Sequence, residues 1–136
     1  MRKKSTFYLE SSEGWDFPDG LYSQSSLRAG TEAVLGVMSS SRSIAQLDFS
    51  IFPEGIVPEP GLGKELKLEV WQGNDQLLAI VPEVGLEVKH LRLYFGVAQG
   101  KNPIRFSLNL VGQAVSKAQE AKLPIKFNRL RRLAAP

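Results

Sequence analysis

The chain contains a single histidine, His90, which is the residue type best suited to acid–base catalysis near neutral pH. A histidine base needs a serine or a carboxylate held beside it, and the spacing around His90 indicates no such partner. The serine run Ser39–Ser41 lacks the Gly-x-Ser-x-Gly and Ser-x-x-Lys contexts of catalytic serines. The 136 residues include no cysteine, which excludes thiolate catalysis and disulfide bonds. We therefore predict that the chain is not an enzyme and uses no cofactor.

Carboxylates gather in one early segment, where Glu13, Asp16 and Asp19 stand close to Trp15 and Phe17. This spacing resembles part of a calcium-binding loop, but the second oxygen-rich half and the terminal bidentate glutamate are missing. A lone histidine without cysteine cannot complete a zinc site. The sequence therefore predicts no metal site and assigns these carboxylates to turns.

Positive charge is concentrated at the two ends of the chain. The net charge is +3, yet residues 5–100 carry thirteen acids and six bases, while residues 101–136 carry eight bases and one acid. The basic ends are residues 1–4 and 124–136. Such asymmetry favours an anionic partner or head-to-tail contacts between copies.

Lysine and arginine neutralise phosphates, and the bases of single-stranded nucleic acid stack on aromatic rings. The C-terminal segment places a phenylalanine among four bases, and Tyr8, Trp71 and Tyr94 could add stacking surfaces. We therefore predict a non-enzymatic module that binds nucleic acid, with single-stranded nucleic acid as a candidate ligand. The predicted contact residues are Arg2, Lys3, Lys4, Trp71, Lys126, Phe127, Arg129, Arg131 and Arg132.

A second hypothesis uses the same charges differently. Basic ends that dock on the acidic middle of neighbouring copies would make the chain a structural or assembly subunit, in a homo-oligomer or a phage particle. The N-terminus, Met1–Lys4 followed by only three apolar residues, is too short for a secretory leader. No apolar run approaches the length of a membrane span. The expected compartment is the cytoplasm, or a virion or mobile element made there, with no membrane partner.

Apolar residues alternate with polar ones over several short segments, which is the pattern of half-buried β-strands. Leu66–Trp71 and Gln76–Val81, joined by the polar turn Gln72–Asp75, predict a β-hairpin. Leu86–Val97 changes phase, and with Ile104–Leu110 it predicts a second hairpin. Further strands are predicted at Ala45–Ile51, Val34–Met38, Thr6–Glu10 and Ile125–Leu130, and loops at Ser11–Ser26, Ser39–Ser43 and Pro53–Gly63.

One segment has helical composition. Gln113–Lys122 is rich in Ala, Gln, Glu and Lys and is followed by Pro124, which predicts a short helix near the C-terminus. Seven or eight strands with one helix indicate a mainly β, single-domain chain over residues 1–136. An antiparallel β-sandwich is favoured, and a small barrel of the oligonucleotide-binding type is the alternative.

Overall fold

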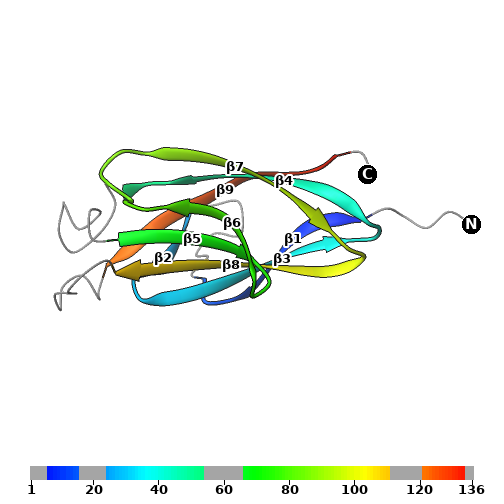
Figure 1. The fold of residues 1–136 in the computed structure, drawn as a ribbon. Coiled ribbons are helices and arrows are strands. Elements are labelled where there is room, and N and C mark those ends of the chain that lie inside the picture. The colour runs from blue at the N-terminus through cyan, green and yellow to red at the C-terminus, as the bar shows by residue number, and fades with distance from the viewer. Residues whose placement is uncertain (1–5, 16–23, 54–65, 111–120, 134–136) are drawn as a thin grey trace, which may run out of the picture.

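The computed structural model describes residues 6–15, 24–53, 66–110 and 121–133, and these residues form two antiparallel sheets packed face to face (Figure 1). Sheet A has the strand order β1-β3-β8-β5-β6, and sheet B has the order β2-β9-β4-β7. The strands are β1 (Phe7–Glu13), β2 (Gln24–Arg28), β3 (Thr31–Ser39), β4 (Ser43–Ile51), β5 (Leu66–Gln72), β6 (Gln76–Val81), β7 (Lys89–Val97), β8 (Gly100–Leu110) and β9 (Lys122–Leu133). The predicted antiparallel sandwich is thus confirmed, and the barrel alternative is not, because the strands form two separate sheets.

The first predicted hairpin is present. Strands β5 and β6 pair antiparallel, and Gly73 in the turn between them has a φ of 63°. That left-handed backbone angle is easily adopted by glycine, which lacks a Cβ, and it explains why the strand pattern breaks at this point.

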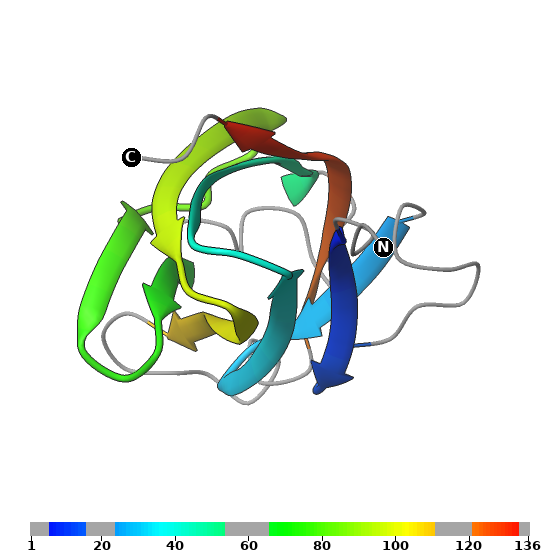
Figure 2. The same cartoon turned by 90° about the vertical axis from the view of Figure 1, so that its right-hand side faces the viewer.

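The second predicted hairpin is wrong, because β7 and β8 belong to different sheets. Strand β7 pairs with β4 in sheet B, whereas β8 pairs with β3 and β5 in sheet A. The chain therefore crosses from one sheet to the other at Ala98–Gln99, a passage that can be followed from yellow-green β7 to yellow β8 in Figure 2. The phase change within Leu86–Val97 has a simple cause: Leu86 and Val88 precede the strand and are exposed, and the regular alternation starts with β7.

Two other expectations concern the predicted helix and the predicted loop that precedes β3. The predicted helix Gln113–Lys122 lies outside the described residues except for its last two, and Lys122 is already the first residue of β9. No α-helix is present in the described ranges. Strand β2 was not predicted, and its first three residues fall in the predicted loop Ser11–Ser26, because its sequence Gln-Ser-Ser-Leu-Arg offers one large apolar residue where a strand pattern needs several.

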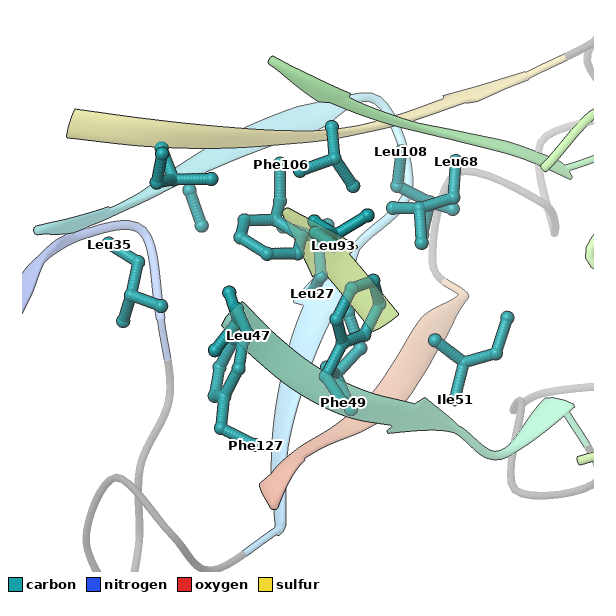
Figure 3. Packing of buried hydrophobic residues seen from close by; sticks show 14 of the residues in the cluster. Leu27, Leu35, Leu47, Phe49, Ile51, Leu68, Leu93, Phe106, Leu108 and Phe127 are labelled. Atoms are coloured by element: carbon teal, nitrogen blue, oxygen red, sulfur yellow. The ribbon is translucent and has the colours of Figure 1, made fainter. Parts of the chain in front are cut away.

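The core lies between the sheets and is filled by alternate residues of each strand, as the period-two pattern requires. Phe106 from β8 meets Phe49 from β4 and Phe127 from β9, with ring centroids 5.4 and 5.6 Å from that of Phe106 (Figure 3). All three side chains are completely buried. Trp15 closes this cluster with edge-to-face contacts to Phe106 and Phe127, and its indole N–H donates to the Val34 carbonyl at 3.0 Å.

Candidate functional site

The residues predicted to contact nucleic acid do not lie on one surface. Phe127 is completely buried in the core and presents no ring to solvent. Trp71 belongs to sheet A, where it is half-buried under the guanidinium of Arg105, 5.3 Å from the ring centroid. The basic residues of β9 belong to sheet B, on the opposite side of the sandwich. Arg2, Lys3 and Lys4 lie outside the described residues.

The remaining predicted residues extend along β9. Lys126, Arg129, Arg131 and Arg132 are all exposed. In the ladder between β4 and β9, Lys126 pairs with Ser50, Arg129 with Asp48 and Arg131 with Gln46. Directly paired residues of an antiparallel ladder share one face of the sheet. These three cations therefore stand beside the polar side chains of β4, which alternate with its buried core residues.

Strand β7 completes this surface from the other side of β4. Its ladder pairs His90 with Ser50, Arg92 with Asp48 and Tyr94 with Gln46. The three strands thus form three rows of side chains, which are His90–Ser50–Lys126, Arg92–Asp48–Arg129 and Tyr94–Gln46–Arg131. We call the surface that these rows form the sheet B face. Because β4 is a central strand with a partner on each side, its polar side chains are held by a rigid backbone.

The middle row contains an ion pair with two hydrogen bonds. Arg92 donates to the two carboxylate oxygens of Asp48, from Nε at 2.8 Å and from a terminal nitrogen at 3.1 Å. The Asp48 side chain is only 17% exposed, and the Gln46 amide lies 3.4 Å from each of its oxygens. The hydrogen bonds from Arg92 lower the pKa of Asp48 below its ordinary value and raise the pKa of Arg92. Asp48 is thus a fixed, ionised acceptor.

A shallow pocket of about 380 Å³ opens beside this pair, lined by Asp48, Phe49, His90, Leu91, Arg92 and Asn128. Asn128 is the extra residue of a bulge in β9, where the register with β4 shifts, and its amide donates to Ser50 Oγ at 2.8 Å. Ser50 Oγ also lies 2.6 Å from His90 Nδ1. Bulges of this kind often redirect a side chain toward a functional site.

Tyr94 is the most exposed large hydrophobic residue among the described part of the chain, at 56%. It stands next to Arg92 along the same face of β7 and next to Gln46 across the ladder, and Gln46 is itself almost completely covered. An exposed aromatic ring beside fixed polar groups offers both a stacking surface and hydrogen bonds to one ligand.

Two other hollows are lined by residues that already serve the fold. A hollow of about 500 Å³ is bordered by Gln72, whose amide donates to the carbonyl of Gly96 in β7, and by Asn102, whose amide donates to the Ala98 carbonyl in the connection between the sheets. Another, of about 260 Å³, is bordered by Trp15, which belongs to the core cluster. The sheet B face is therefore the best candidate for a ligand site.

Within the described ranges, no group of three or more His, Cys, Asp or Glu side chains is placed to hold a metal ion. Of the three carboxylates considered above, Asp16 and Asp19 fall outside those ranges. The described part of the chain also has no helix long and apolar enough to cross a membrane.

Neither a known protein family nor a curated protein matches the sequence. Solved structures do match the fold. A family 35 carbohydrate-binding module from an environmental isolate has a TM-score of 0.51 at 13% identity, over 98% of this chain and 95% of its own. A family 16 carbohydrate-binding module has a TM-score of 0.43 at 12% identity, over 89% of this chain and 92% of its own. A family two carbohydrate esterase from Clostridium thermocellum, solved with cellohexaose, has a TM-score of 0.43 at 14% identity, over 95% of this chain and 34% of its own.

What this chain shares with the family 35 module is its β-sandwich fold. The prediction of a nucleic-acid-binding module is wrong: the fold is shared with a family 35 carbohydrate-binding module, and the predicted aromatic and basic contacts do not share a surface. The alternative of an assembly subunit in a phage particle or a homo-oligomer is contradicted by the same likeness to the family 35 module.

The Asp48–Arg92 pair gives a first testable prediction. Folding lowers the pKa of Asp48 from its ordinary value of 3.8. The pair therefore stabilises the folded protein fully at pH values above 3.8, and this stabilisation is lost as the pH falls through the folded-state pKa. We expect Asp48→Asn to lower the melting temperature at pH 7 by up to about 4 °C, the small effect of a partly exposed pair.

The difference between the wild-type protein and Asp48→Asn should shrink below about pH 4, where the wild-type carboxylate is also neutral. Thermal unfolding from pH 2 to pH 7, followed by circular dichroism, measures this. Asp75→Asn, which changes an exposed turn carboxylate, is the matched control. A difference for Asp48→Asn that stays constant over this pH range would contradict the assignment.

Proposed function

We propose that the chain is a non-catalytic carbohydrate-binding module whose ligand lies on the sheet B face. The observation that carries the proposal is the exposed ring of Tyr94 beside the hydrogen-bonded array of Gln46, Asp48 and Arg92. The likeness in fold to a family 35 carbohydrate-binding module adds support.

The chemistry of this face suits a sugar. A sugar ring has an apolar face of C–H groups, which packs on an aromatic ring, and hydroxyls that both donate and accept hydrogen bonds. Asp48 accepts, Arg92 and Asn128 donate, and His90 can do either depending on its tautomer. Because Asp48 is already held by Arg92 and Gln46, little side-chain order would have to be gained when a ligand binds.

The contact between Ser50 and His90 also bears on catalysis. A serine nucleophile needs backbone or side-chain donors placed to stabilise the developing oxyanion. Ser50 lies in a central strand with ladders on both sides, to His90 and to Lys126, so the backbone N–H groups around it are used in the sheet. Its side chain is also almost completely buried. These features favour a structural role, in which Ser50 fixes His90 and Asn128 at the pocket.

Replacing the exposed tyrosine tests the proposal. We expect the wild-type protein to be retarded by at least one immobilised or gel-embedded polysaccharide in a panel of cellulose, xylan, mannan, dextran and pectin. Tyr94→Ala should weaken that binding roughly tenfold, because aromatic packing contributes about 0.5–1.5 kcal/mol beyond buried area. Its melting temperature should change little, since the ring lies outside the core.

Tyr8→Ala is the matched control, because Tyr8 is similarly exposed, at 50%, but lies on β1 of sheet A. It should leave binding unchanged. Equal losses in the two variants would place the ligand elsewhere, and a wild-type protein that binds no glycan in the panel would overturn the proposed function.

A further inference from the structure

The two sheets differ sharply in charge. The four strands of sheet B contain eight lysines and arginines and a single acid, Asp48. The strands of sheet A contain four glutamates and three bases. The charge asymmetry of the sequence thus becomes an asymmetry between the two sides of the sandwich, and the positive side is the one that carries the candidate site.

On the sheet B face, the one carboxylate is already committed. Asp48 accepts both hydrogen bonds of Arg92, which leaves Lys126, Arg129 and Arg131 without an acidic partner of their own in the described ranges. All three are exposed, and Arg129 adds only a longer-range attraction that lowers the pKa of Asp48. Cations left unpaired along one strand create a positive potential that attracts anions.

The spacing of these cations indicates an extended ligand. Lys126 and Arg131 pair with Ser50 and Gln46, which are four residues apart on β4, or roughly 13 Å at the rise of a β-strand. Arg129 lies between them. A ligand that touches all three must be longer than one sugar ring, and it would pair with all three cations best if it carried more than one negative charge.

The polar groups of the same face favour a glycan over a phosphate polymer. The Asp48 carboxylate sits in the middle row, where it would attract hydroxyl donors and repel a phosphate. A glycan with acid groups offers hydroxyls to Asp48 and anions to the arginines at the same time. We propose that the sheet B face binds an acidic polysaccharide, one that carries carboxylates or sulfate esters on successive sugars, in preference to a neutral one. This inference rests on the proposed function and specifies its ligand.

Pairs of polysaccharides that share one sugar chain and differ only in their acid groups test the contribution of the acid groups. The carboxylate pair is polygalacturonate and its fully methyl-esterified form, and the sulfate pair is dextran sulfate and dextran. Affinity electrophoresis and calorimetry should show at least tenfold tighter binding to the acidic member of one pair, and which pair responds identifies the acid group. That binding should weaken as salt is raised, because exposed charges are screened.

The double variant Arg129→Ala/Arg131→Ala should lower affinity for the acidic probe about tenfold to a hundredfold, since hydrogen bonds between charged groups are the strong ones. The control variant Arg42→Ala/Lys67→Ala also removes two positive charges, but at positions outside the sheet B face. It should have little effect on the affinity. Both variants change surface residues, and their melting curves check that they fold.

The outcomes separate this inference from the proposed function. Equal binding to both members of each pair, or binding to neutral glycans alone, would overturn the acidic preference and leave the proposed function standing. Equal losses in the two double variants would overturn the assignment to this face. Binding to single-stranded DNA without binding to any glycan would overturn both.

Discussion

Phe127→Ala should lower the free energy of unfolding by about 3–5 kcal/mol, the usual cost of removing a buried aromatic ring. The ring is completely buried and packs against Phe106, Phe49 and Trp15, with centroids 5.2–6.2 Å apart. Its loss would leave a cavity where the two sheets meet, because the remaining rings, which come from two strands and the segment after β1, cannot all move to fill it. Urea unfolding followed by tryptophan fluorescence measures the change.

Tyr94→Ala provides the control for this prediction, because it removes an aromatic ring from the exposed face of the same sheet and should change stability by less than about 0.5 kcal/mol. The sequence alone predicts that Phe127 is a nucleic-acid contact. If Phe127 were an exposed contact residue, Phe127→Ala would lower the stability less than Tyr94→Ala does. Loss of stability from Tyr94→Ala equal to that from Phe127→Ala would contradict the assignment of Phe127 to the core.

Asn102→Ala should cost about 2–4 kcal/mol, although it removes a small polar side chain. The Asn102 amide oxygen accepts from the Ala98 N–H at 2.8 Å, and its nitrogen donates to the carbonyls of Val37, Ala98 and Gly100 at 2.9–3.2 Å. These bonds hold the segment where the chain crosses from sheet B to sheet A. The side chain is buried, so its loss would leave backbone groups without partners.

Asn74→Ala is the matched substitution, since Asn74 lies exposed in the turn between β5 and β6. It should change stability by less than about 0.5 kcal/mol. Denaturant unfolding of the two variants side by side gives the comparison. If Asn102→Ala is as mild as Asn74→Ala, the connection does not depend on this amide.

The sequence predicted strands best where one face is buried throughout. In β4, β5 and β8 every second residue enters the core, so the period of two is strong. The pairing of strands was less predictable. Strands β7 and β8 are separated by a short connection of the kind that usually joins a hairpin, and only the crossover held by Asn102 places them in different sheets.

The candidate site was predictable only in part. The basic residues Lys126, Arg129 and Arg131 could be identified from charge alone. Their neighbours could not, because His90 lies 40 residues from Ser50, and Asn128 lies 78 residues from it. Such contacts depend on the register of two ladders and on a bulge, which no local pattern encodes. Tyr94 was one of several tyrosines and tryptophans, and its exposure depends on which face of β7 it occupies.

The place of β9 in the sheet has a consequence for how the protein is made. Strand β2 forms its only described ladder with β9, and β4 depends on β9 for one of its two ladders, although some 70 to 100 residues separate them in sequence. During synthesis, both strands therefore keep open hydrogen-bonding edges until β9 has also been made. Pairings over such distances form slowly, and unpaired edges are templates for aggregation. Once β9 has been made, its exposed lysines and arginines disfavour pairing between a free β9 and the β9 of a second chain, because like charges on the two strands repel.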